Sequence, residues 1–193
     1  MIDKALSFIS NYLNQRMRMS FGLNDDRVVV GSLINPDGSL TSNIENKILL
    51  SVINLEHETT VKSSPTLKHG SSNSYLKSPQ PVHLNIYLLV SANYDSGNYL
   101  EALKMLSTVI GEFQSQPYFT SQENPDLPKN INKLTLEIFN LPLNELSHIW
   151  SGIGAKYVPS IVYKMRMITI DEGKVVQEIP GVSGLQTQSA SKT

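Results

Sequence analysis

The sequence predicts an α+β fold, in which a mixed, mostly antiparallel sheet is covered by two main helices, the first and third along the chain. An amphipathic helix begins the chain, and residues 82–170 then follow the order strand, helix, strand, short helix, strand. Apolar and polar residues alternate along the strands, which is typical of strands with one buried face. The 193 residues suffice for one domain with a substantial core.

A helix over residues 2–19 and a short strand at residues 28–30 are the first elements expected. Apolar residues recur at helical spacing in the first segment: Ile2, Ala5, Leu6, Ile9, Leu13 and Met17. Asp3 lies where the helix dipole favours an acidic side chain. Val28, Val29 and Val30 favour a strand, and the sequence Asn-Pro-Asp-Gly at 35–38 favours a turn.

A long strand is expected over residues 46–61, followed by a long mobile loop over residues 62–81. Strand alternation directs Ile48, Leu50 and Val52 to one face and Leu49, Ile53 and Leu55 to the other. Residues 62–81 are rich in serine, proline and glycine, a composition that cannot bury a core of its own.

The second half of the chain has the clearest periodicity. A strand begins at Val82, and a helix with its start near Asn98 follows, with the apolar face Tyr99, Ala102, Leu103, Leu106, Val109, Ile110 and Phe113. A strand is expected at 133–138, and Pro142 then begins a short helix with the apolar face Leu143, Leu146, Ile149, Trp150 and Ile153.

The last elements are a strand over residues 160–170, a further short strand over 174–179 and a disordered tail over 180–193. These assignments place a single domain at residues 1–179.

Composition excludes several classes of function. The net charge of −1 gives no field that would hold nucleic acid. The absence of cysteine excludes disulfides, thiolate nucleophiles and cysteine metal sites. No stretch is long and apolar enough for a membrane span, and the first residues do not resemble a signal peptide, so we expect cytoplasmic synthesis.

Candidate chemical motifs have simpler explanations. Glu56, His57 and Glu58 do not form a metal site, because only Glu56 and Glu58 share a strand face. The glycines at 152 and 154 follow a helix instead of preceding one, so they predict a helix stop and not a phosphate loop. No Gly-x-Ser-x-Gly turn is present. We therefore expect no catalytic, cofactor or metal site.

Four segments, in this order, resemble a known family. They are IENKILLSVINLE at 44–56, LNIYLLVSANY at 84–94, LTLEIFNL at 134–141 and WSGIGAKYVPS at 150–160. The resemblance is to the N-terminal domain of cap proteins in extracellular, phage-tail-like contractile injection systems of the antifeeding-prophage type, and it covers about residues 1–170. It implies a fold like that of phage tail terminators. Some members carry a further C-terminal domain, whose role is not implied for this chain.

The resemblance implies a structural, non-enzymatic cap. Six copies would form a ring at the baseplate-distal end of the inner tube and sheath, stop polymerisation and join sheath to tube, in a particle that can be released from the cell. The implied partners are copies of the chain, the sheath and tube proteins, and, as a further candidate, a second cap protein. Two alternatives stay open: a transient assembly chaperone or adaptor for tube or sheath subunits, and a small hydrolase or nucleotide-binding enzyme.

If the protein acts by assembly, two of its segments are the candidate contact surfaces. The polar end of the 46–61 strand and the 62–81 loop are the first candidate for an arm that binds a neighbour, and the 160–170 strand, with Lys164 and Arg166 exposed, is the second. The candidate interface residues are Glu56, Glu58, Lys62, Tyr75, Lys156, Tyr157, Lys164 and Arg166.

Overall fold

The computed structural model describes residues 1–59, 67–69, 74–77, 82–129, 131, 133–170 and 177–180. The chain divides into two compact units. The first comprises Met1–Glu58 and His83–Thr169, and the second comprises Thr59–Val82 and Ile170–Thr193. That these units act together as the one domain expected for 1–179 stays a prediction.

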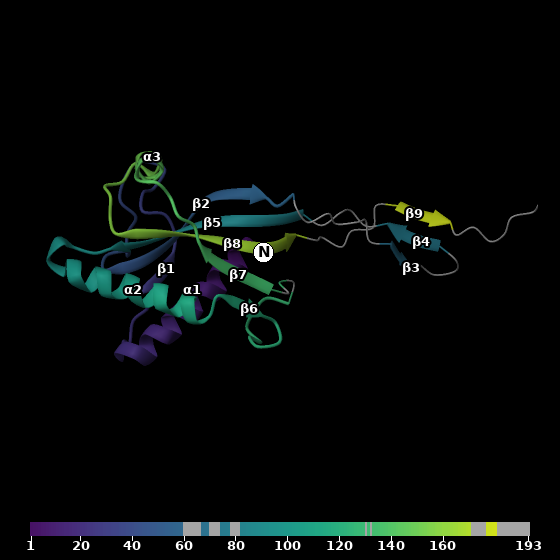
Figure 1. The fold of residues 1–193 in the computed structure, drawn as a ribbon, viewed down its shortest axis with the longest axis horizontal. Coiled ribbons are helices and arrows are strands. Elements are labelled where there is room, and N and C mark those ends of the chain that lie inside the picture. Colours follow the sequence, from purple (N-terminus) through teal and green to yellow (C-terminus); the bar gives the residue numbers. More distant parts are fainter. Residues whose placement is uncertain are drawn as a thin grey trace, which may run out of the picture. The chain divides into compact units, whose positions relative to one another are not determined.

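A six-stranded sheet and three α-helices make up the first unit (Figure 1). Its elements in chain order are α1 (Ile2–Phe21), β1 (Val28–Val30), β2 (Lys47–His57), β5 (Val82–Asn93), the 3-10 helix η1 (Ser96–Asn98), α2 (Tyr99–Ser115), β6 (Tyr118–Thr120), β7 (Lys133–Ile138), α3 (Leu143–Ile153) and β8 (Ser160–Ile170). Each helix and strand predicted for residues 2–170 is present, which confirms the α+β class.

The strand order in this sheet is β1-β2-β5-β8-β7-β6. β1 pairs with β2 in parallel, whereas β2 with β5, β7 with β8 and β6 with β7 are antiparallel. β5 and β8 also run in opposite directions. Ala92, at the end of β5, donates its N–H to the carbonyl of Pro159, just before β8, while Lys164, further along β8, lies over Tyr87. The sheet is therefore mixed and mostly antiparallel, as predicted.

β2 differs from the predicted strand in length and in alternation. It ends at His57, and its register against β5 shifts between Val52 and Asn54, so Ile53 is an extra residue on the β2 side. Such a bulge reverses the alternation of all later side chains. Leu55, opposite Ile86, consequently faces the same side of the sheet as Leu50, and its predicted orientation was wrong.

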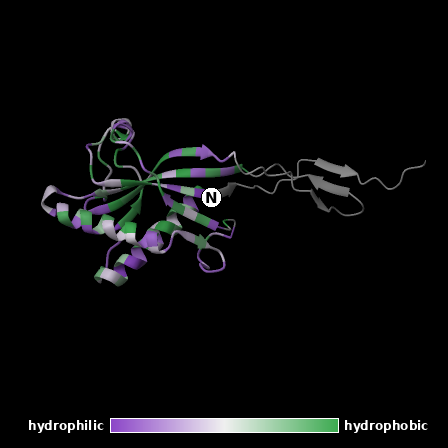
Figure 2. Cartoon of the chain, in the orientation of Figure 1, coloured by the Kyte–Doolittle hydropathy of each residue, from purple (hydrophilic) through white to green (hydrophobic). Residues whose placement is uncertain are grey.

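Two hydrophobic clusters lie on opposite faces of the sheet. The larger one joins α1 and α2 to the sheet, and its fully buried members include Ile9, Leu13, Ile48, Leu50, Leu88, Val90, Val109, Phe119 and Met165. The smaller one lies beneath α3 and consists of Leu33, Ile44, Leu49, Leu89, Trp150 and Val162. Figure 2 shows apolar residues along the central strands and a mixture of polar and apolar residues on the helices.

The cover of the sheet therefore differs from the expected pair of first and third helices. α1 and α2 share one face, and α3 covers the other together with Leu33 and Ile44 from the segment between β1 and β2 (Figure 1). The periodicity of α2 correctly predicted its buried residues Ala102, Leu106, Val109 and Phe113. A periodic pattern cannot, however, predict which face of the sheet a helix covers.

Both later helices begin with apolar residues that are exposed. In α2, Tyr99 and Leu103 were expected on the buried face, but both are exposed, as is Leu100. In α3, Leu143 is 85% exposed. The N-terminal end of each helix lies beyond the hydrophobic cluster that the rest of the helix contacts. The predicted apolar faces therefore began about one turn too early. None of the helices in the described part of the chain has the length and apolar composition that crossing a bilayer needs.

The second unit contains a three-stranded antiparallel sheet of order β3-β4-β9. Its strands are β3 (Leu67–His69), β4 (Ser74–Lys77) and β9 (Gln177–Pro180), with Leu67 opposite Lys77 and Tyr75 opposite Ile179. Two strands thus lie within the segment predicted as a loop at 62–81. The short strand expected at 174–179 is present as β9, and residues 181–193 of the expected tail lie outside the described residues.

A buried asparagine joins the edge strand β1 to α1. The Asn14 side-chain oxygen accepts hydrogen bonds from the N–H groups of Arg27 and Val28, at 2.9 and 2.8 Å. Its amide Nδ2 donates to the Val28 carbonyl at 2.8 Å, and the Ser10 hydroxyl donates to the same carbonyl at 2.9 Å. Backbone groups at the outer edge of the sheet are thereby satisfied by helix side chains, which protects the edge from other pairing.

Replacing Asn14 with alanine should destabilise the fold. The substitution leaves the N–H groups of Arg27 and Val28 without their buried acceptor, which should cost about 1–3 kcal/mol of unfolding free energy. Urea unfolding followed by circular dichroism measures the change. Asn11→Ala, at an exposed position of the same helix, is the matched control and should change stability by less than about 0.5 kcal/mol. Equal stability of the two variants would contradict the anchoring role of Asn14.

Candidate assembly surface

Three adjacent strands bring Glu56, Tyr87 and Lys164 together. The Lys164 ammonium donates to Glu56 Oε2 at 2.8 Å, and the Tyr87 hydroxyl donates to the same oxygen at 2.9 Å. The Lys164 nitrogen also lies 5.2 Å from the centre of the Tyr87 ring, within cation–π distance. The polar end of β2 and the strand β8, which the sequence offered as two separate candidates, therefore meet in one cluster.

Asn85 extends this cluster along β5. Its side chain is almost fully buried, and its Nδ2 donates to Glu58 Oε2 at 2.8 Å and lies 3.5 Å from Glu56 Oε2. Glu56 and Glu58 thus lie on one side of the strand, as strand alternation predicted. Two carboxylates with an amide donor do not form a metal site, and no three metal-ligand side chains gather anywhere in the described part of the chain.

Arg166 and Glu137 continue the cluster onto β7. The Arg166 guanidinium and Glu137 Oε2 form an ion pair at 3.1 Å across β8 and β7. Since Val162, on the same face of β8 as Lys164 and Arg166, packs in the cluster beneath α3, these groups lie on the α3 face of the sheet. We call the whole set the polar ladder, and its members are Glu56, Glu58, Asn85, Tyr87, Glu137, Lys164 and Arg166.

The charges in the ladder stabilise one another. The hydrogen bond from Lys164, followed by that from Tyr87, lowers the pKa of Glu56, and Glu56 in turn raises the pKa of Lys164. The Lys164 side chain is only 16% exposed, whereas it was expected to be exposed. Its ammonium folds back over Tyr87 onto Glu56, which explains the difference. Ion pairs between exposed groups contribute little to stability, so the ladder orients side chains more than it stabilises the fold.

An apolar cleft of about 640 Å³ lies between the sheet and α3 on this face. It is lined by Val52, Ile53, Asn54, Tyr87, Phe139, Leu141, Ile149, Gly152, Ile153 and Val162. Tyr87 belongs to both the cleft and the ladder, and its ring packs edge-on against Phe139 with 4.8 Å between the ring centres. An apolar hollow bordered by oriented polar groups is the composition of a protein–protein contact surface.

Lys156 and Tyr157 follow the end of α3 and take no part in the ladder's hydrogen bonds. Gly154 adopts a left-handed conformation, with φ 76°, and its N–H bonds to the carbonyls of Trp150 and Ser151. The predicted glycine helix stop is therefore confirmed. Trp150 is buried and its ring contacts that of the exposed Tyr157 edge-on at 5.6 Å, so the tryptophan is a core residue that supports a surface tyrosine.

Of the eight candidate residues, the structure brings together Glu56, Glu58, Lys164 and Arg166. Lys62 lies outside the described residues, and Tyr75 lies in β4 of the second unit. Sequence reasoning missed Asn85, Tyr87 and Glu137. The alternation on β5 did place Asn85 and Tyr87 on one face, but only the strand order, which brings β8 beside β5, gives them Lys164 as a neighbour.

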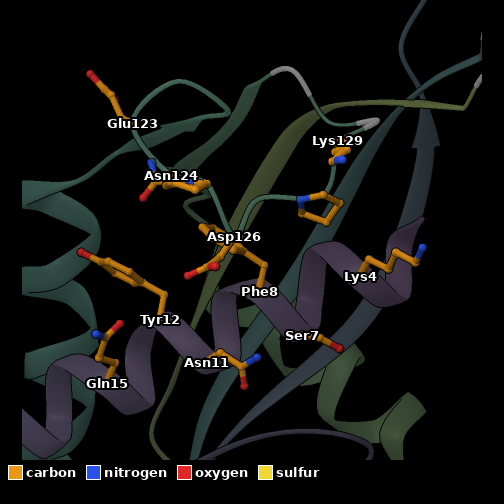
Figure 3. Close-up of a pocket in the computed structure, with 12 residues that line it drawn as sticks. Lys4, Ser7, Phe8, Asn11, Tyr12, Gln15, Glu123, Asn124, Asp126 and Lys129 are labelled. Atoms are coloured by element: carbon orange, nitrogen blue, oxygen red, sulfur yellow. The ribbon is translucent and has the colours of Figure 1, made fainter.

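A second cleft, of about 780 Å³, lies between α1 and the loop over residues 123–129 (Figure 3). Lys4 and Lys129 lie at one end, and Tyr12 and Gln15 at the other. The lining mixes apolar side chains, such as Phe8, with polar side chains of both charges. None of the described residues that line it is a histidine, the side chain used most often as a general base. The cleft therefore provides no support for the hydrolase alternative.

Replacing Lys164 with methionine should raise the pKa of Glu56 toward its ordinary value of 4.5. Because pairing holds this pKa below that of the unfolded chain, the stabilisation exists above pH 4.5 and is lost as the pH falls through the lowered pKa. NMR titration of the Glu56 carboxyl measures the shift. Lys156→Met, at an exposed lysine, is the control and should leave the titration unchanged. An unchanged pKa in Lys164→Met would contradict the pairing.

Comparison with known proteins agrees with this fold. The sequence matches no curated protein. Among solved structures, the sheath/tube terminator of the extracellular contractile injection system PVC, in the extended state, has a TM-score of 0.61 at 12% identity, covering 96% of this chain and 64% of that chain. The tube-terminating cap of the anti-feeding prophage has a TM-score of 0.57 at 13% identity, covering 94% and 60%. This chain therefore spans less than two thirds of either protein.

The sequence itself shows the family. Residues 6–184 match the family model described as the Pvc16 N-terminal domain. The match includes every strand of the described residues and most of α1, so it covers the six-stranded sheet, the ladder, the smaller hydrophobic cluster and all of the larger one except Ala5. The chain belongs to the Pvc16 N-terminal domain family.

Proposed function

We propose that this protein is a structural cap that ends the tube of a contractile injection particle. The observation that carries the proposal is the shared fold, since 94–96% of the chain superposes on a sheath/tube terminator and on a tube-terminating cap. Family membership supports the same role. The proposal concerns only the part of those larger proteins that this chain matches.

A protein can end a tube by binding alone, without any catalytic step. A terminator has to dock onto the last ring of a polymer and leave no surface onto which a further subunit can add. The polar ladder and the apolar cleft supply such a docking surface, because they place oriented charges beside an unfilled hydrophobic hollow. The proposed cap is not an enzyme and needs no cofactor.

We further propose how the copies associate, what they bind and where they assemble. The copies form a closed ring, of six if the tube is six-fold, and the ring joins sheath to tube at the end distal to the baseplate. A ring requires two unlike patches on each copy. A second cap protein is a further candidate partner in this ring. Assembly takes place in the cytoplasm, and the cap then stays with the particle after release.

Particles assembled without this protein should have tubes and sheaths of uncontrolled length. A terminator limits growth at one end, so its loss should broaden the length distribution seen by negative-stain electron microscopy. Gold labelling of a tagged chain should mark one end of each complete particle, opposite the baseplate. Absence of the chain from mature particles, together with a defect in their assembly, would instead identify a transient chaperone or adaptor.

Deleting residues 63–78 should abolish ring formation and leave a folded monomer. The deletion removes β3 and β4, whereas the six-stranded sheet and both hydrophobic clusters belong to the other unit. Circular dichroism and size-exclusion chromatography measure folding and assembly separately. Rings of unchanged size would contradict the role of this segment as an arm, without affecting the proposal that the protein is a cap.

A further inference from the structure

The outer edge of β2 is open over half of its length. β1 pairs only with Ile48, Leu49 and Leu50, and among the described residues no strand lies beside the outer edge of β2 from Val52 to His57. The Glu58 N–H donates to the His83 carbonyl of β5. Since backbone groups alternate in direction along a strand, those of Leu55 and His57 point away from β5. Val52 and Leu55 are 40% and 48% exposed.

The opposite edge of the same sheet is also open, at the end of β7. β6 pairs only with residues 133–135, and the Leu136 N–H bonds to the Pro117 carbonyl. The Phe139 N–H bonds to Val162 of β8, so the backbone groups of Ile138 point outward. Ile138 is 48% exposed. The strand therefore continues past β6 with an unpaired edge, as far as the described residues show.

A hollow of about 220 Å³ adjoins the β7 edge, on the face that α1 and α2 cover. Its lining consists of Ile110, Phe113, Gln114, Pro117, Leu136, Ile138 and Tyr163. Tyr163 is only 2% exposed, and its hydroxyl has no hydrogen-bond partner among the described residues. A buried hydroxyl normally has a partner. The hollow is lined mainly by apolar side chains and lies beside an open strand, so a chain that pairs with this edge would cover it.

The two edges match each other in direction and in face. Strand directions alternate through β2, β5, β8 and β7, so β2 of a second copy placed in the same orientation would run antiparallel to β7. Val52 and Leu55 lie opposite Leu88 and Ile86, on the face of the larger cluster. Ile138 and the hollow lie on that same face. The exposed apolar side chains of one edge would therefore meet the apolar hollow of the other.

We propose that the β2 edge of one copy pairs with the β7 edge of the next, with Leu55 packed against Ile138 and into the hollow beside Tyr163. This inference rests on the proposed cap function and specifies how its ring closes. The edges are unlike and lie at opposite ends of one sheet, so each copy offers one of each, which is the requirement for a closed ring of identical copies. The occupant is a second copy because both halves of the joint are present on one chain.

Charge does not oppose this pairing. Glu56 and Glu137 lie on the other face, near the two edges, and would approach each other across the joint. Each already has a cation from its own copy, Lys164 and Arg166 respectively. The joint therefore leaves no unpaired carboxylate, and His57, at the open end of β2, extends into solvent in the isolated chain.

Cysteine cross-linking tests the pairing directly, because the natural chain has no cysteine. Chains with Leu55→Cys are mixed with chains with Ile138→Cys during particle assembly and then oxidised. Paired strands place Cα atoms about 5.5 Å apart, within disulfide range, so we expect dimers that contain one chain of each kind. The double variant should give a ladder of oligomers. Within one copy the two positions are separated by three strand spacings, about 14 Å, which excludes an internal bond.

Chains with Leu55→Cys and Leu143→Cys are the control, because Leu143 is exposed on α3 and belongs to neither strand edge. Cross-links between positions 55 and 138 but not between 55 and 143 would support the proposal. A ring that is visible at the end of the particle but gives no cross-link between positions 52, 55 or 57 and positions 136, 138 or 140 would overturn the proposal, while the cap function would stand. Absence of the chain from the end of the particle would overturn both.

A proline at position 55 provides an independent test. Leu55→Pro removes an outward N–H that has no described partner in the isolated chain, so the monomer should keep its secondary structure, whereas strand pairing should be blocked. We expect association between copies to weaken on the order of tenfold or more. Leu55→Ala keeps the N–H and should weaken it less. Unchanged association of a folded Leu55→Pro chain would overturn the proposal, and if this variant does not fold, the cross-linking result decides.

Discussion

The burial of β5 on both faces is the constraint on which the rest of the structure depends. Ile86, Leu88 and Val90 face the cluster under α1 and α2, and Leu89 faces the cluster under α3. A strand with two apolar faces needs cover on both sides. The helices therefore have to divide between the faces, two on one side and one on the other, and β2 and β8 have to flank β5 as its neighbours in the sheet.

The smaller cover on the α3 face has functional consequences. One short helix leaves part of that face uncovered, and the strands β2, β5, β8 and β7 present polar groups there in place of a third layer. The ladder and the cleft thus arise from the same cause, which is incomplete cover of a sheet face. A surface of this kind suits a protein whose proposed role is to dock, since docking buries what the isolated chain leaves exposed.

The edges of the sheet are also covered only in part. β1 and β6 are each three residues long, so they protect only part of β2 and β7. Asn14, with three hydrogen bonds, and Ser10, with one, secure the protected part of one edge to α1. Natural sheets rarely leave long apolar edges open unless another chain pairs with them. At 12–13% identity to the terminator and the cap, the shape of this frame is shared although most of its residues differ.

Local patterns in the sequence determined the elements. The periodicity of residues 2–19 and 99–113 predicted α1 and α2, and alternation predicted β5, β7 and β8 to within a few residues, because burial on one side of a helix or strand leaves a regular trace in the sequence. The glycine stop after α3 was equally local. Family membership, too, could be inferred from four short segments in order.

Only the tertiary structure decided which of these elements meet. Lys164 and Glu56 are separated by 108 positions, and nothing in either segment states that β8 lies beside β5 and that β2 lies on its other side. The bulge at Ile53 depends on pairing with β5 and reverses the face of Leu55, so alternation alone misplaced the side chain on which the proposed joint depends. Contacts between distant segments are set by the packing of whole layers, and a one-dimensional pattern records only which side of each element is buried.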